Sequence, residues 1–358
     1  MKVYDSDRKI IYPIDPWKVR ETHLDAAHSY RNETIFSVGN GYMGMRGTFE
    51  EGFGGGADAT FNATYINGFY ENYDIEYPEG GYGLARRGQA MVNVADGKII
   101  KPIIDGEELD LSRGKTYFYE RTLDMRKGTV ERKVVWESPG GKLVEFKVKR
   151  LVSFRRHHLA AISFEVKPLN FDGRLKFISH INGNISEKEL GKDMRVGSDL
   201  RGRVLRTIWT SADNTLLILS QKTKKSKFTL YCAAEHDFYP EGDATFAVET
   251  DDDAVKLEMD TFARQGKSYT VVKYLSYFTN RDVDNYDDTE LFRMAVSQVR
   301  EAKSDGIKVI ETEQEKYLCD FWDDADVVIE GYPAAQQAIR FCTFSLLQSA
   351  GRDHKTNI

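Results

Sequence analysis

The chain has 358 residues, of which 41% are hydrophobic and 12% aromatic. This composition supports a large packed core and excludes an intrinsically disordered protein. The formal net charge of −6, from 50 basic and 56 acidic residues, argues against a nucleic-acid partner. No apolar run reaches the roughly 18 residues of a membrane span, and the first ten residues lack the apolar core of a signal peptide.

The three cysteines, Cys232, Cys319 and Cys342, are far apart and form no CxxC pair. We therefore expect neither a disulfide framework nor a metal site, and no cofactor. This cysteine usage favours a cytoplasmic location.

The N-terminal third is rich in glycine and aromatic residues. Gly41, Gly44 and Gly47 follow at a three-residue spacing, which is neither GxGxxG nor a P-loop, and close backbone packing is favoured over ligand contact. A later segment, 65–77, interleaves aromatic and polar side chains. Sugars bind such surfaces, because rings stack on aromatic faces while polar groups hold hydroxyls. A loop packed by its own aromatics is the alternative. The candidate sugar-binding residues are Tyr65, Asn67, Tyr70 and Asp74.

Residues 98–279 show a β pattern. Val144, Phe146 and Val148 alternate with polar neighbours, and turn signals such as Asp105-Gly106 separate several similar runs. Half-polar strands are typical of antiparallel sheets with one solvated face. The prediction is a large antiparallel β-sandwich, with no strand–helix alternation to support a Rossmann-type sheet.

Three charged or titratable motifs within and after this region favour structural roles. The basic run 222–227 (KTKKSK) is interpreted as a solvated hairpin tip rather than a polyanion site. His157-His158 is expected at a turn between strands, and Asp323, Asp324 and Asp326 at a surface or linker. No G-x-S-x-G elbow occurs, so spacing alone reveals no catalytic residue.

Helical signals begin after Thr279. The run 287–290 predicts a helix start, followed by an apolar face of Leu291, Ala295, Val299 and Ala302 that ends at Gly306. The run 312–315 (TEQE) is a capping-box pattern and predicts a second helix start, with an apolar face formed by Tyr317, Leu318, Phe321 and Trp322.

The last predicted helix, 334–350, is apolar nearly all round, with one stripe at Ala335, Ile339, Cys342 and Leu346. Such a helix is expected to be buried on several sides, which the eight residues after it could not achieve. We therefore interpret it as the first helix of a helical body lying beyond residue 358. The expected domains are a sandwich (1–279), a helical linker (280–331) and the start of that body (332–358).

Four segments carry a family resemblance. ETIFSVGNGYMGMRGTFEE (33–51), YGLARRGQAMVN (82–93), IDGEELDL (104–111) and the ending AIRFCTFSLLQSAGRDHKTNI resemble, in order, the glycoside hydrolase family 65 disaccharide phosphorylases. The resemblance implies a fold that is mainly β with a helical C-terminal part. Its parts are a galactose mutarotase-like supersandwich, linker helices and an (α/α)6 catalytic barrel that begins near the end of this chain.

The implied reaction is inverting phosphorolysis of an α-glucosyl disaccharide such as maltose, trehalose, kojibiose or nigerose. One Glu acts as general acid while inorganic phosphate, the co-substrate, attacks the opposite face of the glucosyl ring. The products are β-glucose 1-phosphate and a free sugar. The sequence ending favours trehalose-, kojibiose- or nigerose-type relatives over maltose.

The resemblance places the catalytic Glu and the phosphate site in the barrel beyond Ile358, so this chain alone is expected to be inactive. Arg352 and Lys355, in the loop at the barrel entrance, are further candidate substrate-binding residues near an anionic substrate, although a solvated inter-helix loop is the favoured interpretation. The implied partners are the disaccharide, phosphate, the remaining barrel and a second copy in a homodimer. Two alternatives stay open: a family 65 hydrolase that uses water, and a non-catalytic carbohydrate-binding or dimerisation module.

Overall fold

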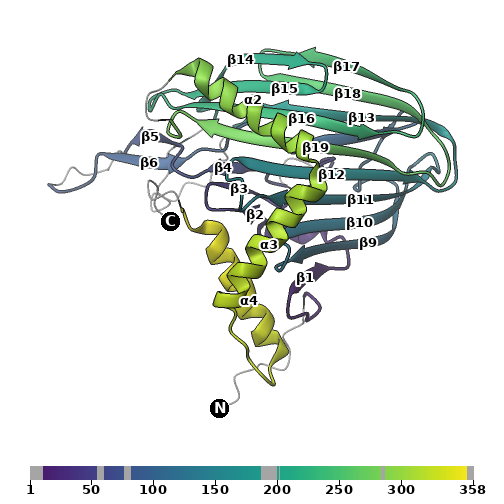
Figure 1. The fold of residues 1–358 in the computed structure, drawn as a ribbon, viewed down its shortest axis with the longest axis horizontal. Helices are drawn as coiled ribbons and strands as arrows, with labels where there is room; N and C mark the ends of the chain where they lie inside the picture. The colour runs from purple at the N-terminus through teal and green to yellow at the C-terminus, as the bar shows by residue number, and fades with distance from the viewer. Residues whose placement is uncertain are drawn as a thin grey trace.

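The fold, in a computed structural model, is described for residues 11–54, 60–75, 82–186, 200, 202–283 and 287–352. Four antiparallel sheets come first and three long helices last (Figure 1). The predicted β region ends where expected, because the last strand finishes at Thr279. No helix in the described ranges is long and apolar enough to cross a membrane.

The largest sheet has nine strands in the order β1-β9-β10-β11-β12-β19-β16-β15-β14. Their bounds are β1 Lys18–Glu21, β9 Lys115–Asp124, β10 Thr129–Glu137, β11 Leu143–Val152, β12 Leu159–Pro168, β19 Tyr269–Thr279, β16 Thr229–Tyr239, β15 Leu216–Thr223 and β14 Leu205–Asp213. The alternation read in the sequence is confirmed in β11, where Val144, Phe146 and Val148 are buried.

The second sheet has five strands in the order β17-β18-β13-β7-β8. Their bounds are β17 Ala244–Thr250, β18 Ala254–Ala263, β13 Gly173–Asn182, β7 Ile100–Ile104 and β8 Glu107–Glu108. Side chains from both sheets fill one continuous core, which includes Phe146, Phe164 and Phe177. The predicted antiparallel β-sandwich is thus present.

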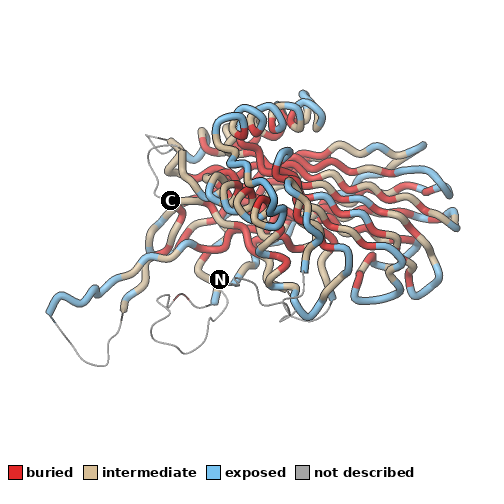
Figure 2. Tube along the Cα trace, turned by 90° about the horizontal axis from the view of Figure 1, so that it is seen from below, coloured by how far each residue is buried: buried red, intermediate tan, exposed pale blue. Residues whose placement is uncertain are grey.

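Two small sheets from the N-terminal third lie at one end of the sandwich (Figure 1). One contains β2 Val38–Gly39, β3 Met43–Met45 and β4 Thr64–Ile66; the other is a hairpin of β5 Tyr70–Asp74 and β6 Arg87–Met91. This β5–β6 hairpin projects from the body (Figure 2), and we call it the arm. A short 3-10 helix η1 Ala26–His28 and helix α1 Ser29–Ile35 precede them.

Helix α2, Asp288–Asp305, lies across the outer face of the large sheet (Figure 1). The predicted helix start at 287–290 is confirmed, and Asp287 is its N-cap, because its side chain accepts a hydrogen bond from the backbone N–H of Thr289. The predicted apolar face is also buried against the sheet. Gly306 ends the helix with a positive φ of 82°, a conformation that glycine adopts without strain.

The prediction that a second helix starts at the TEQE run is wrong. Helix α3 spans Ile307–Ala325, so it begins directly after Gly306. Thr312 lies inside it, and its hydroxyl donates to the Lys308 carbonyl one turn back. A capping signature inside a continuing helix has no free N–H groups to cap. The expected face is present nonetheless, with Leu318 and Trp322 buried.

Helix α4, Pro333–Ser349, matches the predicted final helix. Its buried side chains are Gln336, Arg340 and Phe344, which face the rest of the described chain. The apolar stripe read in the sequence is not buried there: Cys342 is exposed and Leu346 is 68% exposed. Within the described residues, α4 therefore presents an uncovered apolar face.

Candidate functional site

A pocket of about 650 Å³ lies where the N-terminal sheets meet the C-terminal end of α4. Ligand sites favour such junctions between separate structural units. Residues from five stretches of the chain line it: Gly41, Tyr42, Met43, Gly44, Tyr65, Asn67, Gly68, Tyr70, Gln89, Met91, Arg281, Gln348 and Ser349. Three of the predicted sugar-binding residues, Tyr65, Asn67 and Tyr70, are thus brought together.

Strand β4 and the turn after it form one wall. The backbone N–H of Asn67 donates to the Tyr42 carbonyl at 2.7 Å, and its side-chain amide donates to the Gly41 carbonyl at 3.0 Å. Tyr65 pairs with Gly44 across the β3–β4 ladder. A Cβ on Gly44 would meet no atom within 4 Å, so this glycine leaves the space beside Tyr65 open.

The arm forms a second wall through Tyr70, Gln89 and Met91. The ring of Tyr70 meets Phe228 edge-on, with centroids 5.1 Å apart. Arg281 donates to the Gly68 carbonyl and lies over the Tyr70 ring at 5.9 Å. The pocket therefore has a cationic group beside an aromatic one.

The end of α4 forms the third wall. The backbone N–H of Gly41 donates to the Gln348 carbonyl at 2.7 Å, and that of Gly39 donates to the Gln348 side chain at 2.8 Å. A Cβ on Gly41 would lie 1.9 Å from the Ala350 carbonyl oxygen. Close packing is confirmed at Gly41, and also at Gly47, where a Cβ would lie 2.7 Å from the Phe36 carbonyl oxygen. Gly44 alone of the three faces open space.

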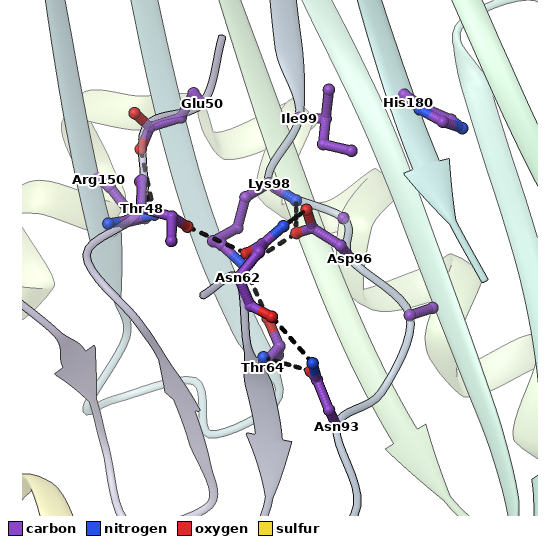
Figure 3. A network of polar contacts seen from close by, with 12 residues as sticks. Thr48, Glu50, Asn62, Thr64, Asn93, Asp96, Lys98, Ile99, Arg150 and His180 are labelled. Carbon is purple, nitrogen blue, oxygen red and sulfur yellow. Dashed lines mark hydrogen bonds and ion pairs between the residues drawn. The ribbon is translucent and has the colours of Figure 1, made fainter. Parts of the chain in front are cut away.

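A buried polar network lies beneath β4 (Figure 3). Lys98 is 2% exposed, and its ammonium donates to the Thr64 hydroxyl at 3.0 Å and to Asp96 at 2.9 Å. The Thr64 N–H in turn donates to the Asn93 side chain at 2.9 Å. Burial alone would raise the pKa of Asp96, but the charge and hydrogen bonds of Lys98 lower it. The network fixes the residue that precedes Tyr65.

The other predicted site residues lie elsewhere. Asp74 does not line the pocket; its exposed carboxylate pairs with Lys225 at 3.1 Å and Arg87 at 3.7 Å. Arg352 donates to the Tyr317 hydroxyl and the Asn40 carbonyl, which ties the end of the described chain to α3 and the N-terminal sheets. Lys355 lies outside the described residues.

The clustered acids have the structural role that the sequence favoured, whereas the basic run is a hairpin tip whose backbone also binds Glu71 of the arm. The run 222–227 reaches the tip of the β15–β16 hairpin. Asp326 forms a bidentate ion pair with Arg340, both distances being 2.7 Å. His157 and His158 lie in the turn between β11 and β12.

The pocket's chemistry suits hydroxylated ligands. Three tyrosines offer apolar ring faces, while Asn67, Gln89 and Gln348 carry amides that can both donate and accept. No carboxylic acid is among its described lining residues, so the pocket holds no candidate general acid. No group of three or more metal-ligating side chains occurs in the described ranges.

Sequence reasoning missed Arg281, Gln89 and Gln348. Gln348 lies more than 250 residues from β4 in the chain, and no local pattern connects them. The RRGQ run around Gln89 gave no periodic signal, and Arg281 follows the last strand as an ordinary turn residue would.

Comparisons with known proteins fit this architecture. Residues 19–321 match the N-terminal domain of glycosyl hydrolase family 65. The chain is 52% identical over 351 residues to an α,α-trehalose phosphorylase of Thermoanaerobacter brockii, covering 98% of this chain and 45% of that protein. It is 34% identical over 348 residues to the α,α-trehalose phosphorylase of Geobacillus stearothermophilus, covering 96% and 44%.

A solved structure, described as a putative kojibiose phosphorylase from human microbiome, aligns with a TM-score of 0.83 at 22% identity. The alignment covers 94% of this chain and 42% of that one, and it supports the fold. The chain spans less than half the length of the curated relatives it matches. The family match extends over most of the sandwich and the linker helices, so the chain belongs to glycosyl hydrolase family 65, whose N-terminal domain it contains.

Proposed function

We propose that this chain is the N-terminal portion of an inverting α-glucosyl disaccharide phosphorylase, with α,α-trehalose as the first substrate to test. The observation that carries the proposal is family membership together with 52% identity to a trehalose phosphorylase along 98% of this chain. In the whole protein, phosphate attacks the anomeric carbon as a Glu protonates the leaving oxygen, which yields β-glucose 1-phosphate and glucose.

We further propose that the sandwich belongs to the supersandwich type and that α4 is the first helix of the catalytic barrel. The exposed Cys342 and Leu346 support the second point, since the barrel's other helices would cover that face. The pocket reaches the end of α4 through Gln348 and Ser349. We therefore assign it a sugar-binding role beside the barrel, with Tyr65, Asn67 and Tyr70 as contacts.

Arg352 remains a proposed neighbour of the anionic substrate, although its present bonds are structural. The homodimer and the cytoplasmic location remain predictions.

The test is an assay of the full-length protein with trehalose, with and without phosphate. We expect phosphate-dependent glucose release and the β anomer of glucose 1-phosphate, which proton NMR identifies from its anomeric coupling. Equal glucose release without phosphate would favour a hydrolase instead. Kojibiose and nigerose, assayed in parallel, test the choice of disaccharide.

A second assay tests the division of labour in the chain. Residues 1–358 alone should release no glucose 1-phosphate from any α-glucosyl disaccharide. Turnover by this fragment would contradict the assignment of the general acid to the barrel.

A further inference from the structure

The arm carries three of the pocket residues, yet it projects from the body (Figure 2). Its strands pair only with each other among the described strands. An isolated two-stranded hairpin is marginally stable in water. The position of Tyr70, Gln89 and Met91 must therefore depend on a few contacts at the base of the arm.

Glu71, the neighbour of Tyr70, makes the central contact. It is 2% exposed, and its carboxylate accepts hydrogen bonds from the backbone N–H groups of Lys225 and Ser226, each at 2.7 Å, and of Asn72 at 2.8 Å. Burial alone would raise the pKa of Glu71, but these N–H donors outweigh it and lower the pKa. The carboxylate thus stays ionised against the turn.

The same turn also holds Tyr70 directly. The Ser226 hydroxyl donates to the Tyr70 carbonyl at 2.7 Å and contacts the Thr223 hydroxyl at 2.7 Å. Beyond the turn, Phe228 meets the Tyr70 ring, and Arg281 lies within 6 Å of both rings. The basic run that the sequence presented as a solvated tip is therefore the anchor of the arm.

The backbone of this turn is strained. Lys227 has a φ of +64°, in the left-handed region that non-glycine residues seldom occupy. The Glu71 carboxylate binds the two consecutive N–H groups, of Lys225 and Ser226, that come directly before this residue. The basic side chains have a lesser part: among the described residues the Lys225 ammonium pairs with the exposed Asp74, whereas the Lys225 backbone N–H binds Glu71.

We propose that Glu71 is a positioning residue for the sugar pocket, acting through the backbone of the Lys225–Ser226 turn to fix Tyr70 and Arg281. The inference rests on the proposed function, since it assigns the pocket a sugar ligand. Glu71 does not line the pocket and is not a contact itself.

The test compares Glu71→Gln with Lys225→Ala in the full-length protein. The Gln amide keeps one acceptor oxygen but presents its NH2 group to the backbone N–H on the other side, so it removes part of the anchor and the negative charge with little change of volume. Lys225→Ala keeps the N–H that Glu71 binds and removes only the basic side chain. Ser226→Ala removes the bond to Tyr70 and is a milder second variant.

We expect Glu71→Gln to raise the KM for trehalose about tenfold, with kcat and the KM for phosphate within twofold of wild type. Ser226→Ala should raise the KM for trehalose about threefold, and Lys225→Ala should leave all three constants unchanged. An unchanged KM in Glu71→Gln, or an equal rise in Lys225→Ala, would overturn the proposal. Ser226→Ala decides the case if Glu71→Gln does not fold.

A direct binding measurement separates this inference from the proposed function. Saturation-transfer NMR with trehalose should give a strong signal for wild type and a weak one for Glu71→Gln. If Glu71→Gln binds trehalose as strongly as the wild type does, only the positioning role is overturned. A wild-type protein that neither binds nor cleaves trehalose would overturn the assignment of this substrate.

Discussion

The junction between the sandwich and α4 depends on the absence of a side chain at Gly41. In Gly41→Ala the new Cβ would lie 1.9 Å from the Ala350 carbonyl oxygen and 2.8 Å from its carbon. Neither atom can rotate away, because both belong to the backbone. The residue also has a φ of +85°, which costs an alanine roughly 1–2 kcal/mol.

Relief of the clash requires α4 to move from β2 and β3. The bonds from the Gly41 and Gly39 N–H groups to Gln348 would then be lost, each contributing about 1 kcal/mol. Together with the backbone strain, the expected loss of unfolding free energy is about 3 kcal/mol. Urea denaturation followed by tryptophan fluorescence measures it, since Trp322 lies in α3 and packs on the core.

Gly44→Ala is the matched control, because it adds the same methyl group in the same segment where no atom lies within 4 Å. Its unfolding free energy should change by less than about 0.5 kcal/mol. A loss below about 1 kcal/mol in Gly41→Ala, or equal losses in the two variants, would refute the close contact between Gly41 and α4.

Three further outcomes are expected. Glu51→Ala leaves the buried Arg132 guanidinium without its bidentate partner and should lower the unfolding free energy, measured by urea denaturation, by about 3–5 kcal/mol. Glu145 is a partly exposed partner of Lys133, so Glu145→Ala should lower it by less than about 1 kcal/mol. Thr312→Ala should change the unfolding free energy by less than about 0.5 kcal/mol, because Thr312 lies inside α3. A loss of about 1 kcal/mol would instead indicate that Thr312 caps a helix start. Burial lowers the pKa of His236 to about 3, so its ring should show no NMR titration between pH 5 and 8. Because the unfolded chain takes up that proton below about pH 6.5, the stability contributed by neutral His236 should fall from that pH towards pH 3.

Much of the fold could be predicted because its signals are local. The alternation in β11 gives its buried face, and Asp287 and Gly306 mark the two ends of α2 by their own side-chain and backbone chemistry. The start of α3 could not be read in the same way. The TEQE run has the composition of a cap, but α3 begins at Ile307, so the N–H groups of this run bond to carbonyls one turn earlier in the same helix.

The candidate site was predictable only in part, for a different reason. Tyr65, Asn67 and Tyr70 were identified because aromatic and polar residues alternate within one short segment. The residues that complete the pocket, Arg281 and Gln348, come from segments that only the tertiary structure brings near. Glu71 was missed because an acidic residue in a hairpin ordinarily faces water, and its burial depends on a turn about 150 residues away.

The contacts at the end of α4 and at the base of the arm are of the same kind, because each holds a side chain by backbone N–H groups. Gln348 accepts hydrogen bonds from two backbone N–H groups of the N-terminal segment. Glu71 accepts two from the turn between β15 and β16. Two of the three walls, the arm and the end of α4, are therefore set by backbone groups that side-chain substitution nearby leaves intact. Substitutions of the lining tyrosines should change sugar affinity without moving the walls. Substitutions of Gly41 or Glu71 should move a wall while every lining side chain is retained.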